Sequence, residues 1–255
     1  MLAVMRIILV LMASIIICIF GIIYCLFRPR QRLYHTALFG RLFGSMAPIF
    51  GIQVKIRNLS SDQLPKHCIY IANHQNNYDM ITAACVVRPR TIIVGKKNLL
   101  WIPFFGQLYW LCGNILINRS QSIRSHTTLL QIAKVIKARD ISIWVFPEGT
   151  RSAGRGLLPF KIGAFHAAIS ARVPVVPVCV SNISNKKIKL NRWSNGLVII
   201  EIMDPIYTQK YEPNKVRDMT QYCYEVMKLK IDSLNKEVVE YEMQITRSLN
   251  THVMK

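Results

Sequence analysis

The sequence predicts an α/β protein with a mixed central sheet flanked by helices, preceded by an N-terminal hydrophobic helical membrane anchor. Three observations lead to this prediction. Residues 7–27 carry no charge, the chain from about residue 52 alternates short apolar strands with longer helical patterns, and no internal repeat or long flexible linker interrupts it. We therefore expect N-terminal membrane-associated helices over residues 1–50 and one compact domain over residues 51–255.

The first expected element is a membrane helix over residues 7–27. These 21 residues are about enough to cross roughly 30 Å of hydrocarbon. Arg6 precedes the run and Arg28, Arg30 and Arg32 follow it, an excess that favours placing the following side in the cytoplasm. A cleaved signal peptide is the alternative, but the run is longer than a typical signal core and no small-x-small site follows it.

A second apolar segment covers residues 33–50. It has Arg41 as its single arginine or lysine, and its apolar residues Leu38, Leu42, Met46 and Ile49 recur at helical spacing. We interpret the segment as lying on or dipping into the bilayer beside the first helix. The alternative is a helix packed on the globular core.

The remaining elements follow from apolar runs and their spacing. Strands are expected at residues 53–57, 68–72, 91–95, 115–117, 141–146, 175–180 and 197–202. Helices are expected at residues 79–87, 124–138, 162–171 and about 214–249. A dense aromatic stretch between residues 101 and 110 favours core packing, with an apolar channel or a seat at the headgroup level as alternatives.

Composition and charge limit the classes of partner that we expect. The formal charge of +20 predicts a basic surface that attracts anionic lipid headgroups, nucleic acid or acidic carriers. Zinc-ligand spacing, an RNA-binding aromatic signature and a basic low-complexity tail are all absent from the sequence, so we expect no nucleic acid partner. The seven cysteines are scattered without a Cys-x-x-Cys motif, which is typical of buried thiols in a reducing compartment. We expect no metal and no cofactor.

The candidate chemistry begins after the strand at residues 68–72, with His74 and Asp79. Five positions apart on a regular helix they would point about 140° away from each other, so they must straddle a strand-to-helix turn to pair. There Asp79 can hydrogen-bond one imidazole nitrogen and leave the other free as a general base. This is the His-Asp half of a catalytic triad without its serine, so the activated alcohol would belong to the substrate. No Gly-x-Ser-x-Gly elbow or nucleotide P-loop accompanies it.

A second loop, residues 146–152, follows the strand at residues 141–146. Its proline and glycine predict a tight turn that presents Glu148, Thr150 and Arg151 together. Such a loop suits an anionic substrate.

Four blocks in order resemble the bacterial 1-acylglycerol-3-phosphate acyltransferases, also called lysophosphatidic acid acyltransferases, of the His-x4-Asp family. The blocks are residues 73–79, 113–119, 146–152 and 173–178, and the resemblance covers about residues 50–205. Asn118 departs from the family, whose members often carry Asp there. The resemblance implies transfer of a fatty acyl group from acyl-ACP or acyl-CoA to the sn-2 hydroxyl of 1-acylglycerol 3-phosphate, giving phosphatidic acid in phospholipid biosynthesis.

Within this reading His74 is the general base and Asp79 stabilises its imidazolium. The substrate-binding candidates are Arg119 and Arg151 for phosphate, with Lys96 as a third cation. Glu148 and Gly149 shape the loop and the acceptor pocket, and Thr150 donates a hydrogen bond.

The expected partners are the thioester donor, the lysophosphatidic acid acceptor and membrane phospholipid. The expected location is the bacterial inner membrane, with the catalytic domain facing the cytoplasm, where both donors are found. One alternative is a membrane-tethered basic module that binds anionic lipid or nucleic acid without chemistry. Another is an acyltransferase of the same superfamily with a different acceptor, such as glycerol 3-phosphate.

Overall fold

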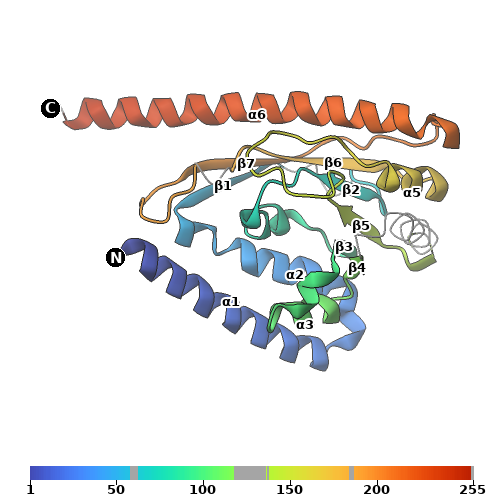
Figure 1. The fold of residues 1–255 in the computed structure, drawn as a ribbon, viewed down its shortest axis with the longest axis horizontal. Helices are drawn as coiled ribbons and strands as arrows, with labels where there is room; N and C mark the ends of the chain where they lie inside the picture. Colours follow the sequence, from blue (N-terminus) through green and yellow to red (C-terminus); the bar gives the residue numbers. More distant parts are fainter. Residues whose placement is uncertain (58–62, 118–135, 137, 184–186, 254–255) are drawn as a thin grey trace.

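The computed structural model describes residues 1–57, 63–117, 136, 138–183 and 187–253, and within them the strands form one sheet (Figure 1). The strands are β1 (Ile52–Arg57), β2 (Ile69–Ala72), β3 (Thr91–Lys96), β4 (Ile115–Ile117), β5 (Ser142–Val145), β6 (Val175–Val180) and β7 (Gly196–Ile202). Their order is β1-β7-β6-β2-β5-β3-β4. Only β6 and β7 pair antiparallel among these neighbours, so the sheet is mixed. The expected strands are confirmed, each to within one residue at either end.

Helices cover both faces of this sheet. They are α1 (Leu2–Phe27), α2 (Arg32–Gly44), α3 (Phe105–Leu111), α5 (Gly163–Ala171) and α6 (Val216–Val253). Figure 1 shows α6 running along one face with α5 beside its beginning, while α1, α2 and α3 gather on the other. The expected helices at 162–171 and 214–249 are thereby confirmed. Most of the helix expected at 124–138 lies outside the described residues.

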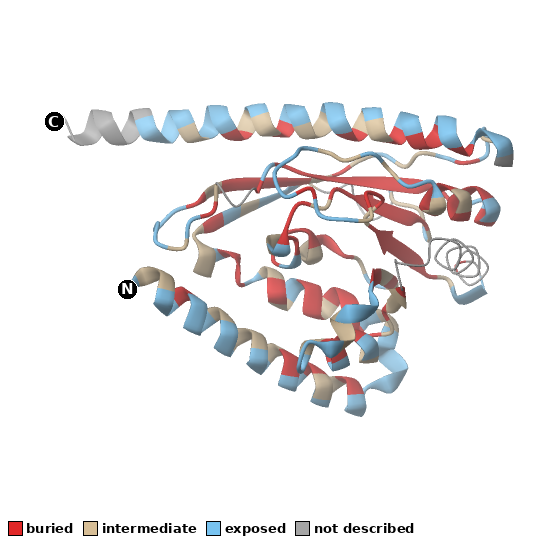
Figure 2. Ribbon diagram, viewed as in Figure 1, coloured by how far each residue is buried: buried red, intermediate tan, exposed pale blue. Residues whose placement is uncertain are grey.

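The sheet separates two apolar cores. On β6, Val175 and Cys179 face the core under α5 and α6, whereas Val176, Val178 and Val180 face the core under the N-terminal helices. This alternation explains why the strand is a continuous apolar run, since both of its faces are buried. By contrast, Figure 2 shows that α6 is buried only on the side toward the sheet and exposed on the other.

The helix expected over residues 79–87 is wrong. The structure has two 3-10 helices there instead, η4 (Asn77–Met80) and η5 (Ala83–Val86). Part of the reason is α2, because a Cβ on its Gly40 would overlap the carbonyl oxygen of Ala84, and a Cβ on Gly44 would overlap the Cβ of Cys85. The backbone of η5 therefore packs directly on α2, and this close contact overrides the local helical pattern.

Residues 33–50 pack on the globular core, and their contact with the bilayer stays a prediction. α2 buries His35, Phe39 and Phe43, and it packs in the core beneath the sheet. A 3-10 helix, η2 (Ala47–Phe50), and the left-handed Gly51 then lead into β1. The division of the chain between residues 50 and 51 stays a prediction.

Candidate active site

The two candidate loops meet at the carboxyl ends of neighbouring parallel strands. β2 leads into residues 73–79, β5 leads into residues 146–152, and the two strands are paired. Beyond the strands, the backbone N–H of Ser152 donates to the carbonyl oxygen of His74 at 2.8 Å. The loops therefore form one unit at the edge where α/β sheets commonly bind their ligands.

His74 and Asp79 are in direct contact, as the sequence predicts. The Nδ1 atom of His74 lies 2.6 Å from Oδ2 of Asp79, and the same oxygen accepts the backbone N–H groups of Gln75 at 2.8 Å and Asn76 at 3.3 Å. The aspartate side chain is 5% exposed and the imidazole 14%. Because an ionised carboxylate only accepts hydrogen bonds, this contact selects the neutral tautomer in which Nδ1 carries the proton and Nε2 presents its lone pair.

The imidazole of His74 is also held by an aromatic neighbour. Its ring stacks on Phe146, the first residue of the second loop, with centroids 4.1 Å apart and planes inclined by 19°. Phe146 packs against the core under the N-terminal helices. The ring is therefore fixed by a hydrogen bond at one edge and by a stacked face.

Glu148, in the second loop, connects the two loops by a hydrogen bond to the backbone of His74. Its side chain is buried, with Oε1 accepting the backbone N–H of His74 at 2.5 Å and Oε2 accepting that of Leu158 at 2.9 Å. Burial raises the pKa of this carboxyl from 4.5 to about 7, an effect that the two N–H groups and Arg155 oppose and the charge of Asp79 reinforces. Both oxygens are engaged by the backbone, so Glu148 fixes the peptide of the histidine.

The chain turns after Glu148, with Gly149 in a conformation that favours glycine and with the next two residues exposed. Gly149 has φ +71°, and a Cβ there would lie 2.7 Å from Cε of Lys161. Thr150 and Arg151 follow, and both are exposed. The turn thus presents a hydroxyl and a guanidinium to the solvent side of the loop.

Three amide side chains around His74 form a set that the sequence reasoning missed. Asn73 and Val180 exchange a pair of hydrogen bonds of 2.9 Å each. Gln75 donates to the carbonyl oxygen of Ser181 at 2.8 Å and accepts the N–H of Ile183 at 2.9 Å, while Asn76 donates to the carbonyl oxygen of Ile183. These amides tie the histidine loop to the chain after β6. Their signal in the sequence is three amide residues flanking a histidine at a strand end.

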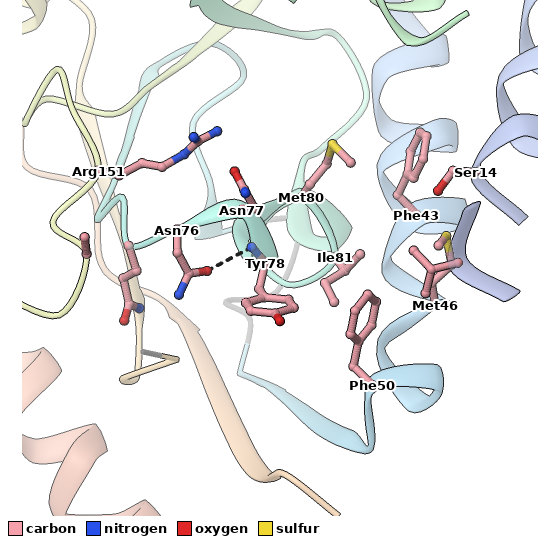
Figure 3. A pocket seen from close by; sticks show the side chains of 13 residues that line it. Ser14, Phe43, Met46, Phe50, Asn76, Asn77, Tyr78, Met80, Ile81 and Arg151 are labelled. Atoms are coloured by element: carbon pink, nitrogen blue, oxygen red, sulfur yellow. Dashed lines mark hydrogen bonds between the residues drawn. The ribbon is translucent and has the colours of Figure 1, made fainter. Parts of the chain in front are cut away.

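A cavity of about 530 Å³ opens beside these loops (Figure 3). Its polar side is formed by residues 75–77 and Arg151. The apolar side includes Val10 of α1 and Phe43 of α2, together with Met46 and Phe50. In Figure 3 the labelled Arg151 lies on the side of the cavity opposite Phe43 and Phe50. The sequence did not predict that the N-terminal helices line this space.

The remaining candidates are placed less directly. Lys96 is exposed at the carboxyl end of β3, on the same edge of the sheet but outside the lining of the cavity. Arg119 and the unusual Asn118 lie outside the described residues, just after β4. Within the described part of the chain, no group of three or more His, Cys, Asp or Glu side chains is arranged to hold a metal ion.

Comparison with known proteins agrees with this geometry. Residues 53–181 match the protein family described as Acyltransferase. The chain is 55% identical to the 1-acyl-sn-glycerol-3-phosphate acyltransferases of Salmonella typhimurium and of Escherichia coli K12, over 95% of this chain and 98% of each relative. It is 50% identical to the protein of the same name from Haemophilus influenzae, over 94% of this chain and 99% of that one.

A solved structure shows the same fold. The crystal structure of the 1-acyl-sn-glycerophosphate (LPA) acyltransferase from Thermotoga maritima superposes with a TM-score of 0.68, covering 92% of this chain and 98% of the other at 23% identity. The histidine loop and the Glu148 loop both lie within the matched family region. The chain therefore belongs to the acyltransferase family, among the bacterial 1-acyl-sn-glycerol-3-phosphate acyltransferases.

Proposed function

We propose that this acyltransferase moves a fatty acyl group from acyl-ACP or acyl-CoA to the sn-2 hydroxyl of 1-acyl-sn-glycerol 3-phosphate, forming phosphatidic acid for phospholipid synthesis. The observation that carries the proposal is the 2.6 Å contact between His74 and Asp79 beside a cavity with one polar and one apolar side. The relatives' names supply the acceptor. The geometry supplies a base for its hydroxyl.

The reaction needs one proton acceptor and no covalent acyl-enzyme. Nε2 of His74 takes the hydroxyl proton as the acceptor oxygen attacks the thioester carbonyl carbon. Asp79 stabilises the imidazolium that forms. When the tetrahedral intermediate collapses, the carbon–sulfur bond breaks and the imidazolium returns its proton to the leaving thiolate. Base and acid are thus the same side chain, and its orientation is fixed by Asp79 and Phe146.

Among the substrate-binding candidates, Arg151 lines the cavity. The exposed Arg151 stands on its polar side and offers a guanidinium fork to the acceptor phosphate. Lys96, exposed at the carboxyl end of β3, and Arg119, which lies outside the described residues, are the further cations that we assign to the acceptor phosphate. The apolar side formed by α1 and α2 accommodates part of an acyl chain, Gly149 shapes the loop, and Thr150 donates a hydrogen bond to the substrate.

The proposed location is the inner face of the cytoplasmic membrane, with the catalytic domain in the cytoplasm. α1 is the one helix in the described residues that is long and apolar enough to cross a bilayer. Most of its surface is exposed in Figure 2, yet Cys18, Gly21 and Cys25 are buried on the domain side. The exposed apolar face of α1 is what we propose to contact lipid.

The test is to measure phosphatidic acid made by purified wild type and His74→Ala in detergent, with acyl-ACP and acyl-CoA as separate donors. Loss of the base should lower the rate about 10²-fold or more. His67→Ala is the matched control, because His67 pairs with Asp140 away from the site, and it should keep the wild-type rate.

Three results would contradict the proposal. A normal rate for a folded His74→Ala would remove the general base. Product only with glycerol 3-phosphate would mean another acceptor. No product from a folded wild type with any donor would favour the basic binding module.

A further inference from the structure

The connection between β6 and β7 presents an exposed tryptophan and two exposed cations. Trp193 is 76% exposed, which is unusual for so large an apolar side chain. Lys189 and Arg192 beside it are exposed as well. We refer to residues 189–194 as the Trp193 loop. The active site described above makes no use of it.

A buried arginine of α1 holds the Trp193 loop in place. Arg6 is 4% exposed, and its guanidinium donates to the carbonyl oxygens of Leu190 at 3.0 Å, of Trp193 at 2.9 Å and of Arg192. Three hydrogen bonds to one guanidinium compensate the cost of removing this charge from water. The loop is thereby fixed to the first turns of α1, and Figure 1 shows the N-terminus and this connection at the same end of the molecule.

A buried asparagine holds the other side of the loop. The side chain of Asn195 accepts the N–H of Lys189 at 2.8 Å and donates to the carbonyl oxygens of Lys189 at 3.0 Å and Phe50 at 2.7 Å. Gly51 leaves room for this contact, because a Cβ there would overlap the carbonyl oxygen of Trp193. Two buried polar side chains thus build a defined loop whose indole is left in solvent.

The neighbouring part of α1 is the beginning of its exposed apolar face. Met5 and Ile8, on either side of Arg6, are 47% and 51% exposed, and Val4 is 60% exposed. If this face contacts lipid, as proposed above, the loop bonded to Arg6 lies beside the N-terminal end of the helix that carries that face. Tryptophan favours the headgroup level of a membrane, and lysine and arginine favour anionic headgroups there.

We propose that the Trp193 loop is a second membrane-contact surface, which inserts its indole among the headgroups of an anionic bilayer beside the N-terminal end of α1. The inference rests on the membrane association proposed above. The occupant is lipid because the loop combines exposed cations with an aromatic side chain and is fixed to the helix that carries the apolar face. Its effect is to set the orientation of the domain on the membrane.

The test uses the full-length chain in vesicles of phosphatidylethanolamine and phosphatidylglycerol that contain brominated lipid, which quenches nearby indoles. Trp101→Phe and Trp110→Phe remove the other exposed tryptophans and leave Trp193 with Trp144, which is buried in the core. Trp193→Phe in the same background isolates the emission of Trp144. We expect strong quenching of the Trp193 component by bromine near the headgroups and little quenching of Trp144.

A matched pair of double variants tests the contribution of the cations to lipid binding. Replacing Lys189 and Arg192 by glutamine should raise the lipid concentration needed for half-maximal quenching, at fixed phosphatidylglycerol content, by about fivefold per cation. Replacing Lys228 and Lys236 by glutamine is the control. These residues are exposed on α6, across the sheet from α1, and their replacement should leave the lipid concentration needed for half-maximal quenching unchanged.

The outcomes separate the two proposals. A chain that does not float with vesicles overturns the membrane association and the loop contact together. A chain that floats while Trp193 stays unquenched overturns the loop contact alone.

Discussion

Replacing Glu148 by glutamine tests whether a buried carboxylate holds the peptide of His74. Both carboxylate oxygens accept a backbone N–H, at 2.5 Å from His74 and 2.9 Å from Leu158. Glutamine keeps one acceptor and turns an NH₂ group toward the other N–H, which leaves buried donors unpaired. A shift of the histidine by as little as about 1 Å can lower a rate by up to about 10²-fold. We therefore expect Glu148→Gln to lower kcat while the KM for the acceptor changes little.

The same variant has a pH signature that follows from burial. The pKa of Glu148 is raised from 4.5 to about 7, so ionisation is disfavoured in the folded state. The associated stability is fully present below about pH 4.5 and is lost as the pH rises to about 7. At about 1.36 kcal/mol per pKa unit, the wild type loses about 2.5 kcal/mol from this group between about pH 5 and pH 8. Glutamine does not ionise, so the variant loses no stability from this position over the same pH range.

The assay is denaturant unfolding of both proteins in detergent at several pH values. The unfolding free energy of Glu148→Gln minus that of the wild type should rise by about 2.5 kcal/mol from about pH 5 to pH 8. Glu240→Gln, on the exposed side of α6, is the control and should show a much smaller trend. A difference that does not change with pH would refute the reasoning, because it would mean that this carboxyl is not desolvated.

Three further predictions concern the same edge of the sheet. Asp79→Asn should lower kcat about 10²-fold or more because the amide no longer fixes the imidazole as a base, and a folded variant with normal kcat would contradict the pairing. Arg151→Ala should raise the KM for the phosphate-bearing acceptor about tenfold or more with a smaller change in kcat, whereas an unchanged KM in steady-state kinetics would place the phosphate elsewhere. Gly149→Ala should lower the unfolding free energy by about 1–2 kcal/mol, because φ is +71° and the added methyl group meets Lys161. A variant that unfolds thermally at the same temperature as the wild type would exclude this strain.

Much of the fold could be predicted because the central strands β2, β5 and β6 are buried on both faces. A strand such as Val175–Val180 must be apolar at every position, and this leaves a run that sequence reasoning finds directly. The tertiary contacts around α2 left no comparable signal. Its glycines at positions 40 and 44 admit the backbone of η5, and no local pattern indicates which segment will use that space.

The candidate site also has parts that the sequence could predict and parts that it could not. The spacing of His74 and Asp79 is local and could be predicted, as could the exposed turn that carries Arg151. The cavity could not, because Val10 and Phe43 reach it from segments that the sequence presents only as apolar helices. An apolar residue that faces a substrate and one that faces lipid have the same sequence pattern, so only the packing distinguishes them.

The wrong helix at residues 79–87 shows how the site itself shapes the local structure. Oδ2 of Asp79 accepts Nδ1 of His74 and two backbone N–H groups, so the carboxylate must turn back over the strand end. Asn76 closes the turn by accepting the N–H of Tyr78. These bonds hold residues 76–80 in tight 3-10 turns, which an α-helix over the same residues would break. At residues 79–80 the hydrogen bonds that orient the histidine outweigh helical propensity, so this part of the wrong prediction coincides with the residues to which we assign the chemistry.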